Sequence, residues 1–146
     1  MKSKQVSSPF KIFEETKKLK FKCTGCGQCC TGSPGYVWLT EVDIQRIADK
    51  LNITKKYFLQ KYTLNIAGRY SLKEIQPSYD CIFYKNKRCT IYQARPKQCR
   101  TYPFWDDILS SKKNWDAEKK YCEGIDHREA DEFTRKKVEN MLNFAE

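Results

Sequence analysis

Cysteine content constrains this chain more than any other feature of its sequence, because eight cysteines occur among 146 residues. Half of them form one run with the pattern C-x2-C-x2-C-C, in a glycine-rich stretch. The run consists of Cys23, Cys26, Cys29 and Cys30, and the dispersed cysteines are Cys81, Cys89, Cys99 and Cys122. A two-residue gap lets a tight turn present two thiolates to one metal, so the sequence predicts a metal-binding protein with all eight as candidate ligands.

The N-terminal sequence bears on how the cysteines are interpreted. Met1-Lys-Ser-Lys4 is not followed by an apolar segment, and no stretch approaches the roughly 20 apolar residues that span a bilayer. We therefore expect a cytoplasmic protein without a membrane span. A reducing compartment disfavours structural disulfides and favours metal or redox chemistry. Adjacent Cys29 and Cys30 would also be strained as partners of each other.

The assignment of cysteines to metal centres stays open at this point. Four plus four matches two four-ligand sites, while a [4Fe–4S] cluster could take three ligands from the run and one from elsewhere. The C-x2-C-x2-C spacing is that of bacterial ferredoxins, although their following C-x3-C-P pattern is absent here. Zinc accepts C-x2-C equally well. For Cys81 or Cys122 taken alone, a buried thiol packed as a small hydrophobe is the alternative.

Two arginines flank Cys99 in the segment Arg95-Pro-Lys-Gln-Cys-Arg100 and are candidate cofactor-binding residues. A guanidinium can offset thiolate charge around a cluster, or bind a substrate carboxylate or phosphate through its planar fork. The alternative is structural: the arginines could satisfy helix-end carbonyls or stack on Tyr92, Tyr102 or Trp105. No catalytic residue can be assigned. The single histidine, His127, is expected to be exposed or to cap a helix, and hydrolase and phosphate-loop motifs are absent.

The formal net charge of +10 would fall to about +6 to +8 once thiolates bind metal. The lysines are scattered, mostly in pairs, and form no long basic block, so a solvated surface is favoured over a nucleic-acid groove. We expect a monomer whose partner is an unidentified protein or small-molecule substrate.

Secondary-structure patterns indicate one domain over residues 1–146, of the α+β class, mostly helical, stabilised by metal and carrying one short β-hairpin. Its core spans about residues 21–126. Thr40 and Thr54 are typical helix N-caps, and Asn52 is expected to end the helix after Thr40. The remaining predicted elements are a lead-in helix over 10–20, a strand over 68–76, a hairpin over 80–93 with its turn at 85–88, a helical turn between Pro96 and Pro103 carrying Cys99, and a closing helix over 127–144 with apolar positions Ala130, Phe133, Lys137, Met141 and Leu142.

The cysteine run, then Cys81, then C-x-I-Y-x2-R-P-x2-C-R-x-Y-P-F from Cys89, then C-x-G-I from Cys122, closely resembles the CxxCxxCC family. This group comprises the YkgJ-type cysteine-cluster proteins, described as zinc- or iron-chelating domains. The resemblance covers about residues 21–126. It implies a metal site, often described as iron–sulfur, and some members are labelled Fe–S oxidoreductases. A related cysteine domain in flagellin lysine-N-methylases implies a link to S-adenosylmethionine-dependent methyl transfer.

Three functional hypotheses follow from the sequence. The first is an iron–sulfur protein with a [4Fe–4S] cluster that serves redox or methyl-transfer chemistry. The second is a zinc-binding structural or interaction module without catalytic activity, in which the metal supplies folding energy. The third is a thiol protein in which one of the eight cysteines is a free reactive thiolate. Whether the chain is an enzyme is left open.

Overall fold

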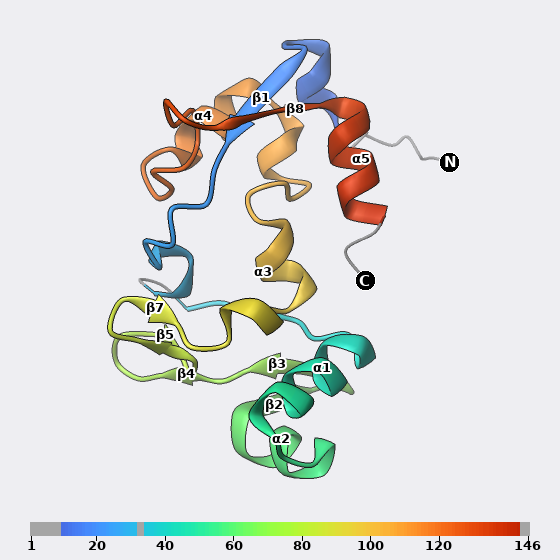
Figure 1. Cartoon of the computed structure of the whole chain (residues 1–146), viewed down its shortest axis with the longest axis vertical. Coiled ribbons are helices and arrows are strands. Elements are labelled where there is room, and N and C mark those ends of the chain that lie inside the picture. The colour runs from blue at the N-terminus through green and yellow to red at the C-terminus, as the bar shows by residue number, and fades with distance from the viewer. Residues whose placement is uncertain (1–9, 32–33, 144–146) are drawn as a thin grey trace. The chain divides into compact units, whose positions relative to one another are not determined.

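The structure, a computed structural model, describes residues 10–31 and 34–143. The chain forms two compact units (Figure 1). Among the described residues, the first unit comprises 10–24 and 101–143, and the second comprises 25–31 and 34–100. Each unit has its own hydrophobic core. Within the described ranges, no helix has the length and apolar character needed to cross a bilayer. The single domain expected over 1–146 stays a prediction.

The first unit is built around an antiparallel strand pair. Strands β1 (Lys18–Phe21) and β8 (Asp131–Thr134) lie side by side, with Leu19 opposite Phe133 (Figure 1). Helices α4 (Lys112–Glu118) and α5 (Arg135–Asn143) and 3-10 turns at Lys11–Glu14 and Ile108–Ser110 complete the unit. Its core includes the fully buried side chains of Trp115, Leu109 and Val138.

Both terminal helices predicted from the sequence are partly wrong. Residues 10–20 form only the 3-10 turn Lys11–Glu14 before β1 begins, and residues 131–134 of the predicted closing helix form β8. Leu19 is buried between two exposed lysines, which is the alternation of a strand. The two strands stabilise each other across more than a hundred residues of sequence, so local periodicity could not reveal the pair.

Gly124 joins the C-terminal part of the first unit to the segment that follows β1. Its carbonyl accepts a 3.0 Å hydrogen bond from the Lys22 N–H, and a side chain at this position would put Cβ 2.0 Å from the Lys22 carbonyl oxygen. The two backbones can therefore approach this closely only because residue 124 is glycine. The C-x-G pattern that begins at Cys122 is thus explained by packing against the segment that enters the cysteine run.

The second unit begins with two capped helices. Helix α1 (Glu41–Leu51) starts at Thr40, which forms a reciprocal capping box with Asp43, and ends at Asn52 in the left-handed conformation. Helix α2 (Lys55–Tyr62) is capped by Thr54, whose hydroxyl accepts a bond from the Tyr57 N–H. These helices and their caps are confirmed.

Three two-stranded antiparallel ladders follow in the second unit. Strand β2 (Thr63–Ile66) pairs with β3 (Arg69–Leu72), β4 (Glu74–Ile75) pairs with β5 (Asp80–Cys81), and β6 (Tyr84–Lys85) pairs with β7 (Arg88–Cys89). The strand expected over 68–76 is therefore split between β3 and β4, and its partner β2 was missed.

The hairpin predicted over 80–93 is only partly correct. Its turn lies at 85–88 as expected, and Asn86 and Lys87 both have the positive φ that a two-residue hairpin turn requires. The pairing, however, ends at Tyr84 and Cys89, and Cys81 pairs with Glu74 instead. Hairpin geometry alone therefore did not identify the correct neighbour of Cys81.

Helix α3 (Lys97–Thr101) follows Pro96 and carries Cys99, and it ends two residues before Pro103, so the predicted helical turn is confirmed. The core of the second unit contains Ile47 and Phe58, and the Tyr62 ring stacks on those of Phe58 and Phe83. The fold class is α+β as expected. The described residues contain several short strand pairs where one hairpin was predicted, and stabilisation by metal stays a prediction.

Candidate metal centre

Five of the predicted ligand cysteines gather in the second unit. Cys29 and Cys30 lie in the 3-10 turn Gln28–Cys30, Cys81 ends β5, Cys89 ends β7 and Cys99 lies on α3. The thiol of Cys30 is hydrogen-bonded to both Cys29 and Cys89, and electrostatic interactions link Cys81 and Cys99 to Cys29 and Cys89. We refer to these five side chains as the thiol cluster.

Gly27 allows the cysteine run to pack against the hairpin formed by β6 and β7. Its φ of 80° lies in the left-handed region, and a Cβ at this position would lie 2.6 Å from the Tyr84 ring and 2.8 Å from the Lys87 carbonyl oxygen. Tyr84 is the strand partner of Cys89. The glycine therefore brings the turn with Cys29 and Cys30 close to the strand that carries Cys89.

A side-chain contact holds the end of the cysteine run against a second strand pair. The hydroxyl of Thr31 donates a hydrogen bond to a carboxylate oxygen of Asp80, the residue before Cys81. Cysteines distant in sequence thus reach one place through a loop, two strand pairs and a helix.

The electrostatics of the cluster favour thiolates at two positions. A hydrogen bond from Cys30 lowers the pKa of Cys29 to about 7, and the nearby Arg95 guanidinium favours the same thiolate. The pKa of Cys89 is also lowered to about 7, first by its hydrogen bond with Cys30. The same hydrogen bonds favour the protonated form of Cys30, so its own pKa is raised. Cys29 and Cys89 are therefore prepared to act as thiolate ligands near neutral pH.

The other two thiols of the cluster are shifted in the opposite direction. Burial raises the pKa of Cys81 to about 11. Burial also raises the pKa of Cys99, and the neighbouring thiolates add to this effect. A positive ion would relieve both penalties, because it neutralises charge where the protein excludes water.

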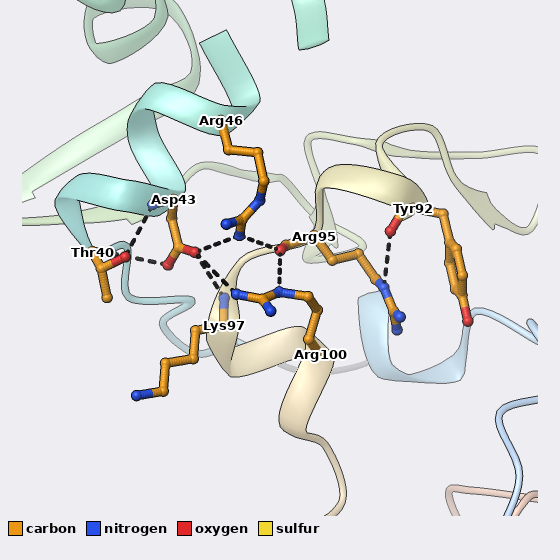
Figure 2. A network of polar contacts seen from close by, with 7 residues as sticks. All are labelled: Thr40, Asp43, Arg46, Tyr92, Arg95, Lys97 and Arg100. Atoms are coloured by element: carbon orange, nitrogen blue, oxygen red, sulfur yellow. Dashed lines mark hydrogen bonds and ion pairs between the residues drawn. The ribbon is translucent and has the colours of Figure 1, made fainter. Parts of the chain in front are cut away.

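The two candidate cofactor-binding arginines have different surroundings (Figure 2). Arg95 donates from Nε to the Tyr92 carbonyl at 3.0 Å and places its guanidinium 3.8 Å from the Tyr92 ring centroid. It also acts electrostatically on Cys29, Cys89 and Cys99. Arg100 instead donates from Nε to the Arg95 carbonyl at 3.0 Å, with Nη2 3.8 Å from Asp43 Oδ1. The structure thus places the Arg95 guanidinium near the thiols, while Arg100 stabilises the turn from Arg95 to Arg100.

Asp43 is the residue of this region that sequence reasoning did not include among the candidate site residues. Its side chain is 1% exposed. Oδ1 accepts hydrogen bonds from Arg46 Nη2 at 2.8 Å and from the Lys97 N–H at 3.0 Å. A capping box is ordinarily a surface feature, and no sequence signal shows that a second segment packs onto it.

The remaining predicted ligands are not members of the thiol cluster as defined above. Cys26 belongs to the second unit and is half-buried, while Cys23 is exposed in the first unit. Cys122 is buried in the core of the first unit, and its role as a metal ligand stays a prediction. His127 Nδ1 accepts a 3.1 Å hydrogen bond from the Glu129 N–H within a turn. It does not cap a helix as expected, because α5 begins only at Arg135.

Within the thiol cluster, Cys29, Cys30 and Cys89 are joined by hydrogen bonds, whereas Cys81 and Cys99 interact with them electrostatically. Among residues 10–31 and 34–143, no three His, Cys, Asp or Glu side chains are arranged so that they could hold a metal ion. The donor set nevertheless fits a thiophilic metal, since five soft sulfur ligands gather, two of them with lowered pKa. Metal binding would replace the shared thiol protons and draw the sulfurs around one centre.

These features define a class of protein, namely a small α+β domain whose cysteines come together from separate segments. The chain belongs to the CxxCxxCC family, described as a "Putative zinc- or iron-chelating domain", whose family model matches residues 22–123. It is similar to an uncharacterized protein of Methanocaldococcus jannaschii, with 30% identity in an alignment of 126 positions, and the match covers 76% of this chain. The match covers 66% of that relative's length, which is just under two thirds. No solved structure matches the chain.

Proposed function

We propose that this protein binds a metal through the thiol cluster, and that the metal is an iron–sulfur cluster of the [4Fe–4S] type serving redox or methyl-transfer chemistry. The observation that carries the proposal is the hydrogen-bonded group of Cys29, Cys30 and Cys89, with Cys81 and Cys99 beside it. Membership in a family described as zinc- or iron-chelating supports metal binding in general. The C-x2-C-x2-C spacing would support the cubane form if Cys23 and Cys26 joined Cys29 as ligands, and of these three only Cys29 belongs to the thiol cluster.

The protein's own residues would have separate tasks in such a centre. Cys29 and Cys89 supply thiolates near neutral pH, while Cys81 and Cys99 contribute sulfur from surroundings that exclude water. The Arg95 guanidinium offsets part of the negative charge. When bound, a [4Fe–4S] cluster supplies one-electron transfer, or an open iron site if only three cysteines hold it.

The kind of reaction depends on how many thiols bind the cluster. Four protein ligands favour electron transfer, as expected of an Fe–S oxidoreductase. Three ligands would leave one coordination site for a substrate or for S-adenosylmethionine, which is how the cluster itself would take part in methyl-transfer chemistry. Arg95 has a planar fork suited to a carboxylate of either molecule.

Zinc is the second candidate, and direct contact between thiols favours it. Around one Zn²⁺ ion with bonds of about 2.3 Å, tetrahedral geometry places sulfurs roughly 4 Å apart, close to hydrogen-bonding contact. Cys30 makes such contacts with Cys29 and Cys89. In this case the metal stabilises the fold, and the protein acts as a structural or interaction module with no catalytic activity.

The test is anaerobic purification, followed by metal analysis, acid-labile sulfide analysis and a visible spectrum on one sample. Iron with sulfide and a broad band near roughly 400 nm support the cluster. Zinc without visible absorption supports the structural module. Cys30→Ala and Cys89→Ala should lose the metal, and Cys122→Ala tests whether the thiol in the other core is also a ligand. Absence of both metals from the wild-type protein would refute the proposal.

A further inference from the structure

We propose that Asp43 is a positioning residue for the metal centre. In this role its buried carboxylate fixes the turn from Arg95 to Arg100, and thereby Cys99 and the Arg95 side chain. The inference rests on the proposed function, because it assigns a role at the same thiol cluster. Asp43 does not bind the metal itself in this proposal, and it acts through the turn from Arg95 to Arg100.

Asp43 connects two segments that are more than fifty residues apart. At the start of α1, Oδ2 accepts a 3.0 Å hydrogen bond from the Thr40 N–H, and Thr40 Oγ1 accepts one of 3.0 Å from the Asp43 N–H. The other carboxylate oxygen points to α3, where it accepts from the Lys97 N–H at 3.0 Å. One side chain therefore caps α1 and binds the first residue of the helix that carries Cys99 (Figure 2).

Two arginines extend this connection to the backbone of Arg95. Arg46 Nη2 lies 2.8 Å from Asp43 Oδ1 and 3.0 Å from the Arg95 carbonyl oxygen. Arg100 Nε donates to the same carbonyl at 3.0 Å, and its Nη2 lies 3.8 Å from Asp43 Oδ1 (Figure 2). The Arg95 backbone is thus held by two guanidinium groups, both of which also pair with Asp43.

This arrangement orients the parts of the turn that face the thiols. With its carbonyl fixed, Arg95 extends its side chain toward Tyr92 (Figure 2) and acts electrostatically on Cys29 and Cys89. Cys99 lies between Lys97 and Arg100, the residues on either side that contact Asp43. A shift of this turn would therefore move one candidate ligand and the nearby positive charge together.

A helix cap alone would not need these contacts. A cap uses one carboxylate oxygen at a solvated helix end, whereas Asp43 is buried and is compensated by two arginines and a backbone N–H from another element. Replacing one oxygen with an amide group leaves either the cap or α3 without its acceptor, and it removes the charge that both arginines face. Outer partners of metal ligands typically change metal affinity roughly 10- to 100-fold when they are mutated.

The experiment compares the full chain with Asp43→Asn and with two matched controls in the same unit. Asp49→Asn removes one negative charge from α1 at an exposed position, where the carboxylate accepts a hydrogen bond from Gln45 Nε2. Thr54→Ala removes the cap of α2, so it destabilises the unit without touching the Asp43 contacts. Zn²⁺ and Fe²⁺ affinities are measured by competition with a chromophoric chelator. Alkylation of Cys99 and Cys81 by iodoacetamide in the metal-free protein is followed peptide by peptide.

Asp43→Asn should weaken metal binding by roughly 10- to 100-fold. It should also accelerate alkylation of Cys99 severalfold relative to Cys81, while both controls stay close to the wild type in each measurement. Wild-type behaviour of Asp43→Asn, or an equal effect of Thr54→Ala, would overturn the positioning role. If the wild-type chain binds neither metal, the proposed function fails, and selective alkylation of Cys99 still decides whether Asp43 positions this thiol.

Discussion

At the scale of single residues, Cys30 has the central place in the thiol cluster. Its thiol is hydrogen-bonded with both Cys29 and Cys89, and these contacts are the largest cause of the lowered pKa, about 7, of each of the two. A donor shared between two sulfurs gives a metal-free protein that already contains thiolate character at neutral pH. The adjacent pair Cys29 and Cys30 thus combines a stabilised thiolate with the proton donor that stabilises it.

This arrangement predicts a pH profile for Cys89 in the reduced, metal-free chain. Alkylation requires the thiolate, whose fraction rises with pH, so the rate should be half-maximal near pH 7. Cys30→Ala removes the donor and should move the midpoint upward, toward that of an ordinary thiol. Cys30→Ser keeps a donor at the same position and should keep the midpoint low. Equal midpoints for the two variants would show that Cys30 is not the cause.

At the scale of structural elements, the contact between the cysteine run and the β6–β7 hairpin determines whether the cluster can assemble. Gly25 and Gly27 both have positive φ, but a Cβ at Gly27 would meet Tyr84 and Lys87, whereas nothing lies within 4 Å of a Cβ at Gly25. Alanine at Gly25 would therefore introduce backbone strain alone, whereas alanine at Gly27 would introduce backbone strain and steric overlap.

Gly25→Ala should lower the free energy of unfolding by about 1–2 kcal/mol through backbone strain alone. Gly27→Ala should cost a further 1–3 kcal/mol, about the typical effect of overpacking, and should also reduce metal retention. Urea denaturation and metal analysis of both variants provide the measurements. If both variants lose metal equally, packing against the hairpin is unimportant for the site.

Elements defined by short-range signals were predictable from the sequence. Thr40 and Thr54 are caps whose bonding partners lie three residues ahead, and Pro96 starts the turn with Cys99, so each signal lies within its own element. The prediction missed strands β1 and β8, because each strand is stabilised by a partner that is far away in the sequence. For the same reason, the grouping of the cysteines and the contacts of Asp43 with Lys97 and Arg100 could not be predicted from the sequence.

At the scale of the whole molecule, each unit is stabilised by its own hydrophobic core, and the thiol cluster belongs to only one of the two units. Cys122 lies in one core with Trp115, whereas the thiol cluster belongs to the unit whose core contains Phe58. Each unit contains few residues, and a unit of this size buries only a small hydrophobic core, which supplies limited stability. Metal bound at the cluster should therefore stabilise mainly residues 25–100.

Removal of the metal by a chelator should therefore act unevenly along the chain. Amide hydrogen exchange should accelerate in α1, α3 and the β6–β7 hairpin, because the metal would link these elements directly or through Asp43. Exchange around Trp115 should change less. Mass spectrometry of peptides before and after chelation measures the pattern, and uniform acceleration in both units would argue for ligands in each of them.

The dual contacts of Asp43 have a consequence for the order of folding. The capping box closes within four residues, so it can form as soon as the first turn of α1 appears, whereas its contacts with Lys97 and Arg100 close a loop of more than fifty residues. The Asp43 carboxylate would therefore be in place before the segment with Lys97 and Arg100 packs against it. Capture of the metal would be the last event, and α1 would be the template on which the turn carrying Cys99 is assembled.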